Sequence, residues 1–156
     1  MNFPVYLVRH GEAGMAATDR ERELTDRGRQ HVRLVAERFV TRNELGALKV
    51  FASPLVRAQQ TAEIWMDVLG MQSAFEVDPD ISPEGNVVSF ARKLSEQQGA
   101  WLVVSHFPFV PSLASFLLTG QRERARIATP TGTIISLAPD AESGRPGSYR
   151  LVSVDN

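Results

Sequence analysis

The amino-acid sequence predicts an α/β fold, a three-layer α/β/α sandwich with a largely parallel central sheet and an antiparallel edge. Short apolar, β-prone runs alternate with stretches whose apolar residues recur at helical spacing. The last two β-prone runs follow each other with no helical stretch between them, which favours an antiparallel pair at the edge. The chain has 156 residues, of which 43% are hydrophobic, so we expect residues 1–156 to fold as a single domain.

The first half of the chain contains two strand–helix units. The run Val5–Val8 is the first expected strand, and Thr25 is suited to cap the helix that follows. The apolar positions of that helix are Val32, Val35, Ala36, Phe39 and Val40. A second strand at 49–52 leads to a helix that we expect to start at Pro54 and to end at Gly70.

The second half continues the alternation. A short strand at 75–77 precedes a third helix, expected over Glu84–Gln98. The continuously apolar run Trp101–Val104 is typical of a central strand covered on both faces, and Pro111 is expected to open a fourth helix. The last two strands should pair as a hairpin around a loop rich in Gly and Pro; they are Thr133–Leu137 and Tyr149–Val154, and the loop is Asp140–Gly147.

Composition and charge exclude several classes of protein. The formal net charge of −1 provides no general attraction to nucleic acid or to an anionic membrane, so we expect neither as a partner. The chain has no cysteine, which excludes disulfides, thiolate catalysis and cysteine-based metal sites. No apolar run has transmembrane length, and the first strand begins too early to leave space for a signal peptide, so we expect a cytoplasmic protein.

Polar motifs follow three of the expected strands. In an open α/β sheet the ligand crevice lies beyond the carboxyl ends of the strands, so these motifs should converge. They bring two histidines and two arginines to one edge of the sheet. The motifs are Arg9-His10-Gly11-Glu12, Ser53-Pro54 with Arg57 one helical turn later, and Ser105-His106.

These motifs resemble the histidine phosphatase superfamily, which includes the phosphoglycerate mutases. The matching segments are LVRHGE at 7–12, ASPLVRAQQTAE at 52–63 and VVSHFPFV at 103–110. The small size, RELTDRG at 22–28 and SPEG at 82–85 are most similar to the SixA-type phosphohistidine phosphatases. The resemblance implies a phosphoglycerate mutase-like fold without a cap subdomain and a cofactor-independent phosphatase that forms a phosphohistidine intermediate on His10.

The residue chemistry agrees with this resemblance. Phosphoryl transfer requires positive charge around the phosphoryl oxygens and a nucleophile in line with the leaving group. Arg9 and Arg57 supply bidentate donors, and a histidine among arginines should stay neutral near pH 7 and keep a lone pair for attack on phosphorus. We expect the other ring nitrogen of His10 to donate to a backbone carbonyl, and Gly11 to let the backbone approach closely.

Other residues complete the expected site. His106 should hydrogen-bond the phosphoryl group, most usefully as a cation in the transition state. Phe107 stands where the acid phosphatase branch has Asp, and we count it among the substrate-binding candidates. Ser53 is either a phosphate ligand or a helix cap. Arg22 either faces the phosphate, as the resemblance implies, or belongs to a solvated charged run.

The sequence does not supply an obvious general acid or a metal site. No pair of histidines has i, i+4 spacing on a helix, and the arginines would repel a cation, so we expect no metal and no other cofactor. The segment 70–83 is too short to form a cap. Glu84 is the candidate general acid, with a helix-dipole role as its alternative, and Glu12 is a weaker candidate.

The shortage of acids favours a phosphoramidate substrate, because imidazole is a leaving group that solvent can protonate. The leading hypothesis is therefore a phosphatase that acts on phosphohistidine in a phosphorelay or phosphotransferase protein. One alternative is a small phosphate ester or sugar phosphate cleaved by the same mechanism, and another is a non-catalytic module that binds phosphoproteins. Mutase activity is less favoured without capping segments. The oligomeric state and the closure of the loop Ala13–Arg22 over substrate stay open.

Overall fold

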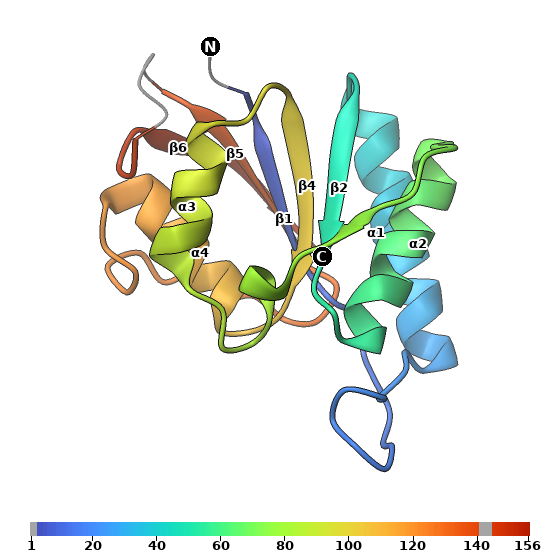
Figure 1. Ribbon diagram of the computed structural model, residues 1–156. Coiled ribbons are helices and arrows are strands. Elements are labelled where there is room, and N and C mark those ends of the chain that lie inside the picture. The colour runs from blue at the N-terminus through green and yellow to red at the C-terminus, as the bar shows by residue number, and fades with distance from the viewer. Residues whose placement is uncertain (1–2, 141–144) are drawn as a thin grey trace.

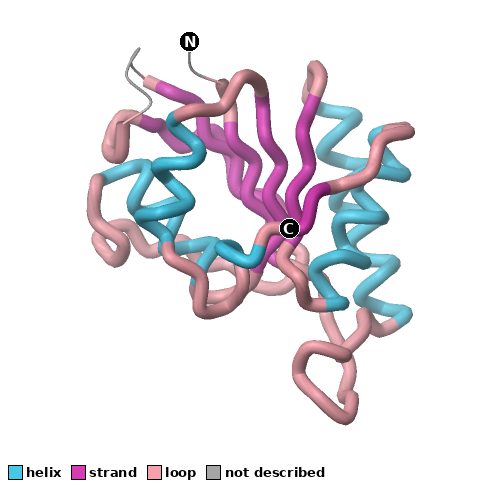
Figure 2. The backbone as a smooth tube through the Cα atoms, viewed as in Figure 1, coloured by secondary structure: helices cyan, strands magenta, loops and turns pink. Residues whose placement is uncertain are grey.

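A central sheet between two layers of helices forms the computed structural model, which describes residues 3–140 and 145–156 (Figures 1 and 2). Within these residues the strands are β1 (Val5–Arg9), β2 (Leu48–Ala52), β3 (Glu76–Val77), β4 (Ala100–Ser105), β5 (Ile134–Pro139) and β6 (Tyr149–Asp155). The helices are α1 (Asp26–Arg42), α2 (Val56–Leu69), α3 (Val87–Ser95) and α4 (Phe109–Thr119), and a 3-10 turn, η1, covers Pro79–Ile81.

The strand order is β3-β2-β4-β1-β5-β6. β3, β2, β4 and β1 run parallel to their neighbours, whereas β5 is antiparallel to β1, and β6 is antiparallel to β5. The expected α/β/α sandwich with a largely parallel sheet and an antiparallel edge is therefore confirmed. The hairpin of the last two strands is confirmed as well, although residues 141–144 of its loop lie outside the described part of the chain.

Each face of the sheet has its own hydrophobic core. Helices α1 and α2 cover one face and α3 and α4 the other (Figure 1). Successive residues of β4 alternate between them, because side chains alternate along a strand: Leu102 packs with Phe39 and Trp65 of α1 and α2, and Val103 packs with Phe90 of α3. Burial on both faces explains why this strand is apolar throughout.

The start of α1 and the end of α2 agree with the sequence expectations, whereas the starts of α2 and α4 do not. The Thr25 side chain accepts a hydrogen bond from the Gly28 amide (2.9 Å) at the start of α1, and Gly70 ends α2 in the left-handed conformation at φ 67°. Helix α2 begins at Val56 rather than at Pro54, and α4 begins at Phe109, so that Pro111 lies inside its first turn. A proline is tolerated there because the first amides of a helix have no helical acceptor.

The third helix is shorter than expected, at Val87–Ser95 instead of Glu84–Gln98. The side chain of Asn86 accepts a hydrogen bond from the Ser89 amide (2.9 Å) and caps the helix. The preceding residues form a turn in which the Gly85 amide donates to the Ser82 carbonyl (2.8 Å). Glu84 therefore lies in this turn, outside the helix, and residues 70–99 form only β3, η1 and α3 with their connections.

The strand register aligns the three polar motifs. Arg9 is paired with Ser105 across β1 and β4, and Ala52 with Val104 across β2 and β4. His10 and His106 thus leave the carboxyl edge of the sheet at the same level, and Ser53, which follows β2, leaves it one residue earlier in the register.

Candidate active site

His10 is the first residue after β1 and is only 7% exposed. Its amide donates to the Ser105 carbonyl of β4 (3.0 Å), which ties the residue to the sheet. Nδ1 lies 2.7 Å from the Gly11 carbonyl oxygen; since a carbonyl only accepts, Nδ1 carries the proton. Nε2 then keeps its lone pair, and it accepts a hydrogen bond from Nε of Arg57 (3.3 Å).

The surroundings of His10 favour the neutral ring. Burial, together with the nearby charges of Arg57, Arg9 and Arg22, lowers the pKa of His10 to about 4, against the opposing effect of the Gly11 hydrogen bond. At neutral pH the ring is uncharged with a free lone pair on Nε2. This is the state that a nucleophile toward phosphorus requires.

Gly11 and Thr61 hold the backbone next to His10. The Gly11 amide donates to Oγ1 of Thr61 on α2 (3.1 Å), and the same hydroxyl donates to the Arg57 carbonyl (2.8 Å). A Cβ at Gly11 would lie 2.6 Å from Cγ2 of Val32, so a larger residue would have to displace that side chain. The sequence alone did not link Thr61 to the site.

Arg57, in the first turn of α2, is buried beside His10 and paired with a carboxylate that the sequence analysis did not single out. Its Nη1 donates to the Asp19 carbonyl (2.8 Å), and its Nη2 donates to Oδ2 of Asp19 (3.2 Å). Arg22 donates from Nη1 to the other oxygen, Oδ1 (3.2 Å), and from Nε to the Gly14 carbonyl (2.8 Å). Asp19 thus bridges two of the arginines expected to hold phosphate.

The charge state of Asp19 follows from these contacts. Burial acts to raise the pKa of Asp19, but hydrogen bonds from Arg22 and Arg57 and their positive charges outweigh it and lower the pKa below its usual value. The carboxylate is therefore ionised at neutral pH. Its side chain is 64% exposed, so it occupies the outer side of the arginine pair.

His106 follows β4 and is almost fully buried, with its ring centroid 5.0 Å from that of His10. Its Nε2 lies 2.5 Å from Oγ of Ser53, which also accepts a hydrogen bond from the Leu55 amide (3.2 Å). Ser53 is not the N-cap of α2, which is Leu55 without a side-chain cap bond; its hydroxyl joins the turn before the helix to His106.

Burial lowers the pKa of His106 to about 3, with the charges of His10, Arg57 and Arg9 acting in the same direction and Asp19 opposing them. The ring is therefore neutral at pH 7 in the structure as it stands. The expected cationic form requires an additional negative charge in the site, which a bound phosphoryl group would supply.

Arg9 and Phe107 lie together at the exposed side of the site. Nη1 of Arg9 donates to the Thr129 carbonyl in the segment between α4 and β5 (2.9 Å), and the guanidinium carbon is 5.6 Å from the centroid of the Phe107 ring. Phe107 is 57% exposed, between the buried His106 and the cis peptide bond to Pro108.

The described hydrogen bonds of the His10 ring go to Gly11 and Arg57, and neither carboxylate considered as a general acid is among its partners. Glu84 is exposed and lines a cleft of about 280 Å³ together with Asp19, Pro54 and Leu55. Glu12 accepts a hydrogen bond from Thr25 at the start of α1 (2.9 Å). Glu84 borders the site from outside, and Glu12 serves the helix.

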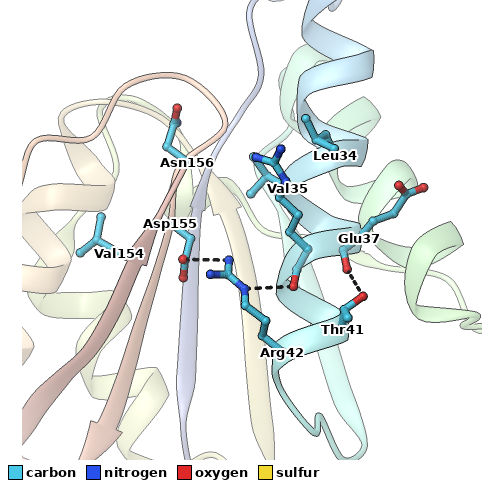
Figure 3. Close-up of a pocket in the computed structure, with 9 residues that line it drawn as sticks. Leu34, Val35, Glu37, Thr41, Arg42, Val154, Asp155 and Asn156 are labelled. Carbon is cyan, nitrogen blue, oxygen red and sulfur yellow. Dashed lines mark hydrogen bonds and ion pairs between the residues drawn. The ribbon is translucent and has the colours of Figure 1, made fainter.

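Other features of the described residues offer no competing site. In residues 3–140 and 145–156, no group of three or more His, Asp or Glu side chains is placed to hold a metal ion, and no helix is long and apolar enough to cross a membrane. A hollow of about 750 Å³ lies between α1 and the end of β6 (Figure 3). Within it, Arg42 pairs with Asp155 (3.1 Å), and His10 and His106 do not line it.

Comparisons with known proteins agree with this geometry. Residues 5–82 match the sequence model of the Histidine phosphatase superfamily (branch 1). The chain is 35% identical over 122 residues to the phosphohistidine phosphatase SixA of Escherichia coli (strain K12), an alignment that spans 75% of each chain. A probable phosphoglycerate mutase GpmB of Enterobacter sp. (strain 638) is 46% identical over 71 residues, which are 42% of this chain and 32% of the relative.

Solved structures extend the similarity to almost the whole chain. A structure of the protein histidine phosphatase SixA complexed with tungstate superposes with a TM-score of 0.84 at 32% identity, covering 98% of this chain and 96% of the other. This match confirms the phosphoglycerate mutase-like fold expected from the sequence. On the family match, the SixA relatives and the shared fold, the chain belongs to the histidine phosphatase superfamily, branch 1, and is a phosphatase of that superfamily.

Proposed function

We propose that this phosphatase hydrolyses phosphohistidine on a protein of a phosphorelay or phosphotransferase system, through a covalent phosphohistidine intermediate on His10. The observation that carries the proposal is the state of His10: its Nδ1 is committed to the Gly11 carbonyl, and its neutral Nε2 faces Arg57. The names of the SixA relatives support the substrate class. The expected cytoplasmic location stays a prediction.

The proposed reaction has two steps. Nε2 of His10 attacks phosphorus, the bond from phosphorus to the substrate imidazole breaks, and the imidazole leaves with the electron pair. Water then attacks the phosphorus on His10, releasing inorganic phosphate and giving one proton to solvent. Arg9 and Arg57 bind the phosphoryl oxygens, and His106 donates to the charge that builds up on them.

The remaining contacts are also proposals. Ser53, the Gly11 backbone and Arg22 complete the phosphate ligands, and Phe107 contacts the substrate. Arg22 is turned to Asp19 in this structure, so a phosphoryl group must exchange with that carboxylate. Each of these roles follows from a position beside His10, His106 or their arginines.

The choice of a phosphoramidate rests on the acids. Asp19 is ionised and paired with arginines, so it carries no proton toward the leaving group. Glu84 is exposed and lines the cleft on the outer side of Asp19, and no hydrogen bond of the described residues joins it to His10 or His106. An alkoxide leaving group needs such a proton. An imidazole ring accepts its proton from water, so this site suits its departure.

The proposal is tested by measuring phosphate release, with EDTA present, from a phosphohistidine-bearing protein and from an aryl phosphate. Wild type should release phosphate faster from the protein, and His10→Ala should release it from neither. Rapid quenching should trap an acid-labile phosphoenzyme in wild type only.

The alternatives produce different results in the same experiment. A faster rate on the aryl phosphate would leave the mechanism and refute the phosphohistidine substrate, in favour of a small phosphate ester. Tight retention of the phosphorylated protein by wild type, with no phosphate released, would indicate a binding module. Full activity in His10→Ala would refute the nucleophile.

A further inference from the structure

The leaving group of the substrate lies on the exposed side of the site, opposite the buried nucleophile. His10 is 7% exposed and His106 is 2% exposed, so both form the floor of the site, and a phosphoryl group enters from solvent. In-line attack places the nucleophile and the leaving atom on opposite sides of phosphorus. The group that leaves therefore contacts the residues at the rim.

Phe107 is the aromatic residue that the structure places at this rim. Its neighbours in the chain are buried, His106 at 2% and Phe109 also at 2%, whereas the Phe107 ring is 57% exposed. Val88 on α3 is also exposed, but it does not directly follow a site residue in the sequence. Exposure alone means little, but this ring directly follows a buried site histidine.

Arg9 connects the Phe107 ring to the part of the site that is expected to bind phosphate. Its guanidinium carbon lies 5.6 Å from the Phe107 centroid, and its charge is close enough to His10 to lower the pKa of that histidine. The guanidinium is anchored from the other side by the Thr129 carbonyl (2.9 Å). A phosphoryl group held by Arg9 thus lies next to the aromatic ring.

We propose that Phe107 is a specificity-determining residue, whose ring stacks with the departing imidazole and selects substrates with a flat aromatic leaving group. The inference rests on the proposed function and assigns the recognition of its leaving group. The substrate ring takes a proton from water on the ring nitrogen that is not bonded to phosphorus. The phosphorus–nitrogen bond then breaks, and its electron pair stays on the ring. Until that bond breaks, the protonated ring is a cation, which an aromatic face attracts.

The experiment compares two small substrates that both contain a phosphorus–nitrogen bond. Free phosphohistidine has an aromatic leaving group, and phosphoramidate has none. The variants are Phe107→Ala, Phe107→Leu and Phe107→Trp, with Val88→Ala as the control that removes an exposed apolar side chain elsewhere. Thermal melting verifies that each variant is folded.

The expected result is a larger loss on the aromatic substrate than on phosphoramidate. Phe107→Ala and Phe107→Leu should lower kcat/KM for phosphohistidine by about 2- to 10-fold more than kcat/KM for phosphoramidate, the range of an aromatic pair. Phe107→Trp should restore the rate, and Val88→Ala should match wild type. Equal losses on both substrates would overturn the inference and show that Phe107 only supports Arg9 or His106; no loss on either would overturn it too.

The same variants separate this inference from the proposed function. If wild type cleaved neither phosphorus–nitrogen substrate but did cleave phosphate esters, the phosphohistidine proposal would fail by itself. Phenyl phosphate and an alkyl phosphate then replace the pair of substrates. A loss in Phe107→Ala confined to phenyl phosphate would support the stacking role, and an equal loss or none would refute it.

Discussion

Acidification should destabilise this fold through the two buried histidines. The pKa of His10 is lowered to about 4 and that of His106 to about 3, mainly by burial. In the unfolded chain both rings bind protons below pH about 6.5. Between that pH and about 4 the unfolded state binds more protons than the folded state, so the free energy of unfolding falls as the pH falls.

The magnitude follows from the size of the shifts. At pH 5 the solution is about 1.5 pH units below the pKa of an unfolded histidine, while the folded ring is still neutral. Protonation therefore stabilises the unfolded state, and each histidine lowers the free energy of unfolding by about 2 kcal/mol relative to pH 7.5. His10 and His106 together cost about 4 kcal/mol, a large part of the 5–15 kcal/mol typical of a domain. Below the folded pKa values the loss levels off.

Urea unfolding at pH 7.5 and pH 5.0 measures this effect in wild type and in His10→Asn. The carboxylates titrate in both proteins, so their contribution to the pH dependence cancels when the two proteins are compared. The variant should lose about 2 kcal/mol less stability than wild type between the two pH values, because it lacks one of the two rings. If the difference in unfolding free energy between wild type and His10→Asn were the same at pH 7.5 and pH 5.0, the assignment of His10 as a buried neutral ring would be refuted.

Two substitutions test the surroundings of the site. Asp19→Asn removes the carboxylate that competes for Arg57, so inorganic phosphate should inhibit about 2- to 5-fold more tightly, the value of a partly exposed ion pair; weaker inhibition would contradict the competition. Gly28→Ala places a Cβ 2.2 Å from the Glu12 carbonyl oxygen and should lower stability by about 1–3 kcal/mol, whereas Gly46→Ala meets no atom within 4 Å and should melt like wild type; equal melting of both variants would contradict the clash.

The sequence predicted those features that depend on local patterns and on a topological rule. Thr25 and Gly70 mark helix ends through their own side-chain and backbone chemistry. His10 and His106 meet because the carboxyl ends of parallel strands share an edge, so the alternation of strands and helices was sufficient to bring them together.

Features that depend on distant contacts were not predictable in this way. The position of Asp19 depends on the path of the loop after β1, which is set by the bridge between Ala13 and Leu24 and by the bond from the Val56 amide to the Arg20 carbonyl (3.1 Å). None of these contacts has a local sequence signal. The start of the third helix was placed too early because Asn86, and not a residue before Glu84, caps it, and the tight turn that includes Glu84 precedes this cap.

The bridge that Asp19 forms to Arg57 and Arg22 couples the position of the loop after β1 to the binding of phosphate in the site. Arg57 cannot donate the same N–H group to Asp19 and to a phosphoryl oxygen, so a phosphoryl oxygen that accepts this hydrogen bond displaces Asp19 from it. By linkage, a protein surface that holds the loop away from Arg57 strengthens phosphate binding by the same factor by which phosphate releases the loop. Met15 in this loop is 94% exposed and available to such a surface. If the proposed protein substrate displaced the loop in this way, its phosphate would bind more tightly than free phosphate without any additional contact to phosphorus.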